Sequence, residues 1–542
     1  MVEVEAGALV ERRLVVARIE LAFEEVVVSS GFSIAQPGAG GAGASLDREQ
    51  ISRLPAFGED LYRAVSTLPG TSSGDLSARF SVRGSLDTEV LARLDGIELH
   101  EPFHLRDYEG VFSIVDPGLI GRADLITGGM PVEFGERSAG ALDMRSRSPK
   151  SSASELGISF TNLWFRNEGV FADGRARWLA SGRRGFLDLV LEISGEGEEE
   201  SGEGEEGDGG APSPAYWDAF AKLEYDLSPR SRWAFHVLGS GDTLKDKENE
   251  DGEIEDYDTS YDSAYLWATH TWIPRDALAV ATHLEGTRLA RDRRIFSAEF
   301  DDEARARDQR DTTILGASQD WTWDRGGDRL VKFGFGAKRF TSDYDYENEI
   351  SLQSLIADVR FQPPIGEFAF DGEISGTSWH AYVADRRRLG RLTTELGVRY
   401  DRDVLSESHV APRLNLVYDG ARWGEWRAGA GRFVQPQRTH ELDVADGVTT
   451  LSASETSDGY YAGWSRDVSG YAVRVEGYYR RTNDPAPALR EVSSSPGIPF
   501  RKRRRTAFGS RRRARRRAAS SGSSCRRARA PSSGGRRTRW PV

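Results

Sequence analysis

FSVRG, at residues 80–84, is the first of four short motifs in one region of the chain. The others are LDGI at 94–97, LITGG at 125–129 and PVEFG at 131–135. Glycine adopts backbone angles that other residues avoid, so these motifs suit the tight turns of a small sheet. The residues of interest are Arg83, Gly84, Asp95, Gly96, Gly128, Gly129, Glu133 and Gly135. Upstream, Ser45 with Arg48-Glu49 resembles a helix cap, and a second helix is expected over 59–68, before Pro69-Gly70. The region predicts a small α+β domain.

From residue 154 the sequence changes to amphipathic strands in pairs. Thr394 to Arg402 places Leu396 and Val398 on one face and Glu395 and Arg399 on the other. We expect about fourteen strands, near 154–166, 169–182, 214–226, 229–241, 261–273, 276–290, 311–323, 329–341, 377–389, 391–403, 409–419, 423–434, 457–468 and 470–482. Tight turns alternate with long polar segments at 192–213, 242–260, 291–310 and 341–376. This alternation is typical of the two rims of a membrane β-barrel, and we predict a mainly β, antiparallel transmembrane barrel after the small domain.

Composition agrees with a barrel and excludes several other classes. The 542 residues contain no run of eighteen apolar residues, which excludes a membrane-spanning helix. The single cysteine, Cys525, excludes a disulfide framework and a thiolate metal site. The start, MVEVEAGALVERRLVV, lacks the pattern of a secretory signal, so an outer-membrane protein would need a different N-terminus from the one given.

Four enzyme or metal signatures match only by their letters. His100 to His104 fits H-E-x-x-H, but Pro102 interrupts the helix that zinc binding requires. Residues 70–74 fit G-x-S-x-G, but a helix precedes them where a strand is needed. Residues 38–43 fit G-x-G-x-x-G without a surrounding βαβ unit, and 247–258 resembles a calcium loop with Lys247 at the first ligand position. We therefore expect no enzymatic activity, no cofactor and no metal site. The acidic segments at 195–210 and 247–258 are expected to be solvated loops, and their charge alone does not decide whether they bind cations.

The ordered motifs from 46 to 148 resemble the plug domain of TonB-dependent outer-membrane receptors. Later stretches, 175–191, 214–227 and 412–442, are similar to the barrel of that family. The resemblance implies a plug folded inside a barrel lumen, where Arg83 would need a carboxylate partner to offset its desolvation. It also implies location in the outer membrane, contact with its lipid, and transport of an unidentified small molecule or chelate.

A short segment before the plug resembles the TonB box of this family. It consists of Glu24, Glu25, Val26, Val27 and Val28. β-Branched residues favour extended backbone, so a periplasmic TonB-type energy-coupling protein would bind this segment by strand addition. The alternative is an ordinary strand of a preceding β-domain.

The last forty-two residues differ from all that precedes them. Residues 501–542 contain 17 of the 72 Lys and Arg residues and no acidic residue, so the remainder carries 55 basic against 85 acidic residues, or −30. The resemblance implies about twenty-two strands, and fourteen would leave unpaired backbone groups in lipid. We therefore predict a frameshift near residue 500, which retranslation of the DNA in the other frames tests. A basic tail for nucleic acid or anionic lipid is the weaker alternative, and no nucleic-acid partner is expected.

The sequence thus divides into five predicted parts. These are an N-terminal β-segment (1–28), a Gly/Ala-rich linker (29–45), the plug (46–150), a partial barrel (151–500) and a low-complexity tail (501–542). Two other functions stay open. A non-energised adhesive or structural barrel predicts that deleting 24–28 leaves uptake unchanged. A soluble all-β binding protein or hydrolase predicts extraction without detergent and dependence on Ser72 or His104.

Overall fold

The computed structural model describes residues 43–53, 60–74, 77–107, 109–187, 210–250, 253–299, 302–326, 328–351, 366–468 and 471–483. The predicted segment 1–28, most of the linker, most of the acidic run at 195–210 and the basic tail lie outside these residues. None of the helices within them is long and apolar enough to cross a membrane.

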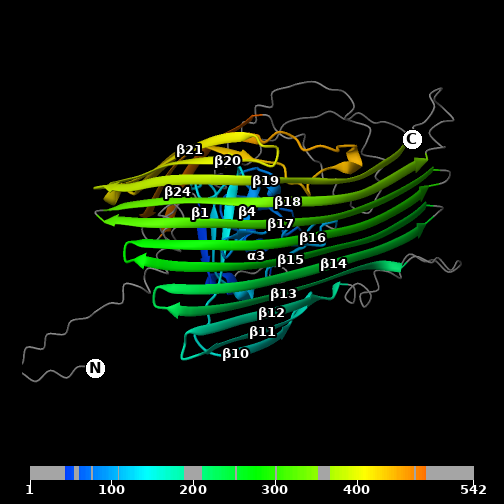
Figure 1. Ribbon diagram of the computed structural model, residues 1–542, viewed down its shortest axis with the longest axis horizontal. Coiled ribbons are helices and arrows are strands. Elements are labelled where there is room, and N and C mark those ends of the chain that lie inside the picture. The colour runs from blue at the N-terminus through cyan, green and yellow to red at the C-terminus, as the bar shows by residue number, and fades with distance from the viewer. Residues whose placement is uncertain are drawn as a thin grey trace, which may run out of the picture.

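Within the described ranges, fifteen strands form one antiparallel sheet in which each strand pairs with its neighbours in the chain. Figure 1 shows the long strands, green β13 to yellow β19, side by side in a curved wall. The fifteen strands are β10 (Ala153–Ile158), β11 (Asn162–Phe171), β12 (Ala176–Gly185), β13 (Gly210–Ser228), β14 (Ser231–Glu250), β15 (Glu253–Arg275), β16 (Leu278–Glu299), β17 (Asp302–Gly326), β18 (Arg329–Ser351), β19 (Gly366–Leu389), β20 (Leu392–Arg402), β21 (Ser408–Asp419), β22 (Glu425–Gln435), β23 (Glu455–Val468) and β24 (Tyr471–Asn483).

The mainly β fold class is confirmed, but the strand pattern needs two corrections. The two strands expected at 154–166 and 169–182 are three, because turns at 159–161 and 172–175 interrupt them. The segments expected as polar loops at 242–260, 291–310 and 341–376 are largely strand. β14 and β15, for example, pair from Ser231 and Trp272 out to Glu250 and Glu253. Charge alone suggested loops there, whereas cross-strand pairs such as Arg291 with Asp308, 2.9 Å apart, allow charged residues to continue the ladder.

The outward face of the sheet carries an apolar band near the short turns. Leu396 and Val398 are exposed on this face, while Arg399 is buried on the other, as the alternation predicts. Exposed tryptophans, Trp272 and Trp323, lie three residues from the ends of β15 and β17. Aromatic girdles beside an apolar band are typical of lipid-facing barrels. Because about 9–11 residues cross a bilayer, β14 to β19, with 20 to 25 residues each, project well beyond it.

A small domain at residues 43–148 lies against the inner face of this wall. Figure 1 shows its elements, coloured blue to cyan, behind the green strands. Its main sheet has the order β1-β8-β9-β4-β5, in which β4 and β9 are parallel, and two small hairpins join β2 to β3 and β6 to β7. The bounds are β1 (Gly43–Asp47), α2 (Arg48–Arg53), α3 (Leu61–Ser66), β2 (Thr71–Ser73), β3 (Phe80–Val82), η3 (Asp87–Glu89), β4 (Val90–Leu94), β5 (Ile97–Glu98), β6 (Phe103–His104), β7 (Phe112–Ser113), η4 (Pro117–Leu119), β8 (Ile120–Ile126) and β9 (Gly140–Ser146).

The start of this domain differs from the expected one in two details. β1 begins at Gly43, inside the predicted linker. Ser45 belongs to β1 and donates a hydrogen bond to Asp124, so it caps no helix. Asp47 and Gln50 form the reciprocal cap instead, each backbone N–H donating to the other's side chain at 2.9 and 2.8 Å.

One apolar core joins the small domain to the wall. Leu61, Tyr62 and Leu125 pack in the same cluster as Phe220 and Trp267 of the barrel strands. The two sheets are therefore fixed to each other by packing as well as by the polar contacts described below. Two short turns of 3-10 helix, η6 (Ala421–Trp423) and η7 (Val444–Asp446), lie in the connections on either side of β22.

Candidate functional site: the interface between the small domain and the wall

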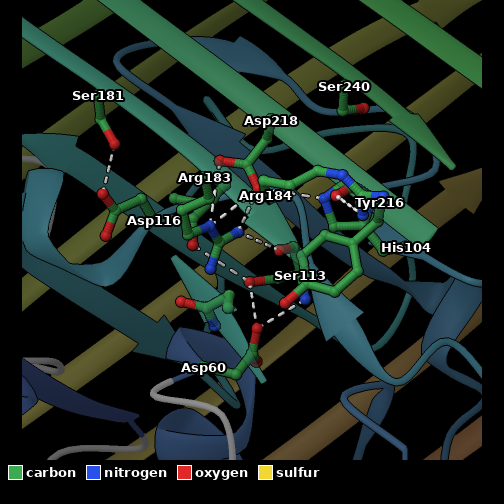
Figure 2. Close-up of polar contacts among 12 residues, drawn as sticks. Asp60, His104, Ser113, Asp116, Ser181, Arg183, Arg184, Tyr216, Asp218 and Ser240 are labelled. Carbon is green, nitrogen blue, oxygen red and sulfur yellow. Dashed lines mark hydrogen bonds and ion pairs between the residues drawn. The ribbon is translucent and has the colours of Figure 1, made fainter. Parts of the chain in front are cut away.

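Asp60 anchors the entry to α3 and ties it to a second loop. Its side chain accepts hydrogen bonds from the backbone N–H groups of Tyr62 and Arg63, at 2.9 and 3.0 Å, which caps the helix. Its other oxygen accepts from the backbone N–H and the hydroxyl of Ser113, at 2.6 and 2.7 Å. Figure 2 shows Asp60 and Ser113 in contact, with Arg183 of β12 directly beyond them. A single buried carboxylate thus joins the helix to the hairpin, and Ser113 in turn accepts from Arg183 of the wall.

Arg183 and His104 share one carboxylate of the wall. Arg183 donates to Asp218 at 2.9 Å and to the carbonyl oxygen of Ser113 at 2.7 Å (Figure 2). The His104 ring lies between Asp218 and Asp242, 3.2 and 3.4 Å from their oxygens. Burial lowers the pKa of His104, but hydrogen bonds to these two carboxylates outweigh burial and the pKa is raised. The two flanking carboxylates therefore favour the protonated ring, in which both nitrogens are donors.

Asp116 holds the η4 turn against β11 and β12. Arg166 donates to both of its oxygens at 2.7 Å, and Ser181 and the backbone N–H of Gly118 donate as well. Burial raises the pKa of Asp116, but the Arg166 hydrogen bonds outweigh burial and the pKa is lowered. The fork-shaped pairing of arginine and carboxylate gives direction as well as energy.

Glu98 is the centre of a charged cluster between the small domain, β18 and the connection that follows β22. Arg438 of that connection donates to both oxygens of Glu98 at 2.8 Å and to Glu136 at 2.7 Å. Arg137 and Lys338 approach Glu98 at 3.2 and 3.6 Å. Burial opposes ionisation of Glu98, but these cations outweigh it and the pKa of Glu98 lies well below its usual value.

The connection that carries Arg438, residues 436–454, folds into the barrel over the small domain. We call it the inward segment. Leu442 and Val444 pack against Tyr344 and Tyr346 of β18. Arg310 of β17 donates to the carbonyl oxygen of Leu442 at 2.9 Å. The inward segment therefore covers the small domain from the end of the barrel where the long strands project.

The PVEFG motif and the glycines before it lie flat against β20 to β23. Gly129 has φ +63°, and a Cβ there would stand 2.4 Å from the Tyr461 hydroxyl. A Cβ at Gly135 would stand 2.2 Å from the Arg399 guanidinium. Arg413 donates to the carbonyl oxygens of residues 130, 131 and 134. These glycines are needed for close approach to the wall as much as for turns, which the sequence did not indicate.

Arg83 has the carboxylate partner that a confined arginine requires. Its guanidinium lies 2.9 Å from Glu476 of β24 and 4.9 Å from the centre of the Tyr478 ring. Asp95 accepts from the backbone N–H of Ser146 at 2.9 Å and fixes the turn to β9. Arg83 and Asp95 both have positive φ, next to the positive-φ glycines 84 and 96.

The enzyme-like signatures have no catalytic geometry among the described residues. The segment from His100 to His104 ends in β6 and contains no helix, and residues 71–73 form a strand that follows α3. In the segment that resembles a calcium loop, Lys247 of β14 lies opposite Asp256 of β15 in the paired strands. Glu133 pairs with Lys332 of β18 at 2.9 Å. The sequence did not indicate four residues of this interface: Asp60, Asp116, Arg183 and Arg438. Only Arg183 could have been found, because the alternation along its strand places it on the inward face.

Buried ion pairs and hydrogen bonds, together with the packed core, thus join a small domain to the inner face of a lipid-facing barrel. Such an arrangement defines a plugged outer-membrane receptor or transporter. Residues 24–142 match the TonB-dependent Receptor Plug Domain, and residues 204–499 match the family described as TonB dependent receptor-like, beta-barrel. The chain belongs to the TonB-dependent receptor family of the outer membrane, whose members are receptors and transporters.

Solved structures share this fold at low sequence identity. The outer membrane transporter YddB from Escherichia coli has a TM-score of 0.60 and 14% identity, over 83% of this chain and 70% of that one. The siderophore receptor PirA from Acinetobacter baumannii has a TM-score of 0.58 and 12% identity, over 82% and 71%. The ferric citrate transporter FecA in its unliganded form has 0.56 and 14%, over 82% and 70%. A search among curated proteins found no match.

Proposed function

We propose that this chain is a plug-gated active transporter for a small molecule or chelate. The ligand enters from the end where the long strands project, and movement of the plug, residues 46–150, opens a path through the partial barrel, residues 151–500. The observation that carries the proposal is the set of ion pairs between plug and wall, which lie outside the apolar core that joins the plug to β12 to β16. Ion pairs such as Arg438 with Glu98 and Arg83 with Glu476 can be exchanged for water when the plug moves, at a lower cost than exposing an apolar interface.

The path is proposed to run along β21 to β24. A cavity lies there between plug and wall, lined by Arg83, Gly129, Arg413 and Tyr461 among others. Gly129 and the PVEFG segment form its plug side, so a shift of this segment widens the cavity without unfolding the main plug sheet. Arg83 lies on the plug side and Arg413 on the wall side, and their charges favour an anionic cargo. An anion could take the place of Glu476 beside Arg83 and of the backbone carbonyl oxygens beside Arg413.

The proposed energy source is a TonB-type protein that binds residues 24–28 by strand addition. The plug match begins at residue 24 and therefore includes this segment. Three consecutive valines favour extended backbone, and main-chain hydrogen bonds would transmit the pull. The ligand is unidentified. Structurally similar proteins include a ferric enterobactin receptor from Pseudomonas aeruginosa and the ferric citrate transporter, which makes ferric chelates the first probes to test.

We also propose that residues 501–542 are not receptor sequence. The barrel match ends at residue 499, where the composition changes to arginine, alanine, serine and glycine. Sequencing the gene and translating the other frames after codon 499 tests this. A reading frame with alternating strands and a terminal aromatic residue is the expected result, and its absence from both frames contradicts the proposal.

Uptake by a strain that lacks other receptors for the probes and carries the frame-corrected gene tests the transport proposal. Val26→Pro removes a backbone donor in the middle of the proposed strand, so uptake of ferric enterobactin or ferric citrate should be lost, with surface binding retained. Ala35→Pro, in the linker, is the matched control and should transport normally. Equal uptake by both variants favours the non-energised barrel, and no binding of either chelate directs the search to cobalamin and saccharides.

A further inference from the structure

Three metal-ligating side chains meet at the outer end of β20 and β21. The strands are joined by a tight turn in which the backbone N–H of Asp403 donates to the carbonyl oxygen of Glu407 at 3.1 Å. The Glu407 N–H donates in turn to the Asp403 side chain at 2.9 Å. His409 follows on β21. The turn therefore presents Asp403, Glu407 and His409 in a fixed arrangement.

The distances among their donor atoms fit ligands of one small cation. The His409 Nε2 atom lies 3.6 Å from Asp403 Oδ2 and 3.7 Å from Glu407 Oε2. All three donor atoms lie within 4.8 Å of one another. Hydrogen bonds of nitrogen to oxygen are shorter, about 2.7–3.2 Å. Two ligands at about 2.0–2.2 Å from a tetrahedral metal lie about 3.3–3.6 Å apart, which agrees with the observed spacing.

Within the described residues, the two carboxylates are the ion-pair neighbours of His409 Nε2, and both are too distant for a hydrogen bond. The Nε2 atom is enclosed and makes no hydrogen bond within the part of the chain that the structure describes. An enclosed polar atom without a partner costs about 1–3 kcal/mol. A bound cation would remove this cost, since neutral imidazole coordinates through the lone pair of Nε2. This is an observation independent of the two carboxylates.

We propose that Asp403, Glu407 and His409 bind a divalent transition metal of the zinc class at the outer mouth of the barrel. One imidazole and two carboxylates with an open fourth position suit zinc, whereas calcium takes six to eight oxygen ligands. The site is distinct from the cavity beside Arg83 and from the proposed path for cargo. It goes beyond the proposed function and does not depend on it.

The site also joins two parts of the mouth. The backbone N–H of Ser454, the last residue of the inward segment, donates to Glu407 at 3.3 Å, and its hydroxyl donates to Asp403. The same inward segment carries Arg438, which pairs with Glu98 of the plug. A metal that fixes both carboxylates therefore fixes the end of the segment that covers the plug. Binding should reduce hydrogen exchange at residues 403–409 and 450–454.

Zinc titration of the full chain in detergent tests the proposal. The background is Cys525→Ser, which removes the only thiol, and excess calcium occupies weak carboxylate sites. The probe is Zn²⁺ alone, measured against a chromophoric competitor. We expect one equivalent to bind, and His409→Ala to weaken binding at least tenfold. His270→Ala, near the opposite rim, is the matched control and should bind as the parent does.

Two results would overturn the site. One is the absence of stoichiometric zinc binding by the parent chain, and the other is unchanged affinity in His409→Ala. X-ray absorption of the zinc-loaded parent chain provides a readout that needs no variant. A shell of one imidazole nitrogen with oxygens supports the proposal, and a shell of oxygens alone contradicts it.

Discussion

Replacing Arg438 with methionine should loosen the inward segment from the plug without disturbing the barrel. The Arg438 side chain is 2% exposed and makes three hydrogen bonds to Glu98 and Glu136. Methionine keeps much of its apolar length but leaves the carboxylates without their main cation. Breaking a buried pair in this way costs about 3–5 kcal/mol. Because Arg137 and Lys338 still approach Glu98, we expect the lower limit, about 3 kcal/mol.

Hydrogen exchange measured by mass spectrometry reports this cost as local opening. At about 1.4 kcal/mol per tenfold change, amides at 436–446 should exchange about a hundredfold faster in Arg438→Met. Arg432→Met is the matched control. Arg432 also pairs with a carboxylate, Asp458 at 2.8 Å, but its side chain is 49% exposed, so the effect should stay under about fivefold. Equal exchange in the two variants would refute the role assigned to the Glu98 cluster.

Three further outcomes follow from the interface. His104→Gln should destabilise the plug most at neutral and lower pH, which thermal unfolding measured against pH tests. The pKa of His104 is raised in the folded state, so its contribution to stability is complete below the unfolded pKa of about 6.5. The contribution is lost as pH rises through the folded pKa. Burial opposes ionisation of Glu101, but Arg106 outweighs burial and lowers the pKa of Glu101 to about 2. The stability that ionised Glu101 contributes should be constant above about pH 5 and lost as pH falls towards 2. In Glu101→Gln, the free energy of unfolding should therefore depend less on pH over that range. Gly129→Ala should lower the yield of folded protein, because alanine is strained at φ +63° and its Cβ would meet Tyr461. Gly477→Ala, whose Cβ would meet nothing within 4 Å, should fold normally. Heat-modified gel mobility compares the two variants.

Local patterns in the sequence predicted the parts of the fold that depend on local chemistry. The alternation at 394–402 gave the correct outward and inward faces, with Leu396 towards lipid and Arg399 towards the plug. Strand ends were harder to predict, because charged residues on β14 to β18 resemble loop sequence until their cross-strand partners are known. The turn at 159–161 contains neither proline nor glycine, so no local signal marks it. The turn at 172–175 contains Asp173-Gly174, a hairpin signal that the strand expected at 169–182 overlooked.

The interface could be predicted only in outline. Arg83 was expected to have a carboxylate partner, but Glu476 lies 393 residues away, and no local pattern in one sequence connects them. The pair of Arg438 and Glu98 spans 340 residues in the same way. The cluster of Asp403, Glu407 and His409 is different, because its spacing, D-x-x-x-E-x-H between two strands, is local. Examining the ends of the predicted strands for histidine beside carboxylates would have found it.

Cross-linking in isolated outer membranes tests the central claim, that the domain at 43–148 fills the lumen of the barrel, most directly. Cysteines replace Arg83 and Glu476 in the Cys525→Ser background, and a short bismaleimide joins them. We expect an efficient intramolecular cross-link for this pair, because the native side chains are 2.9 Å apart. A control pair of Arg83→Cys with Arg288→Cys, on the outward face, should remain unlinked. The absence of a link for the first pair, or a link of equal yield for the control, would contradict a plug inside the barrel.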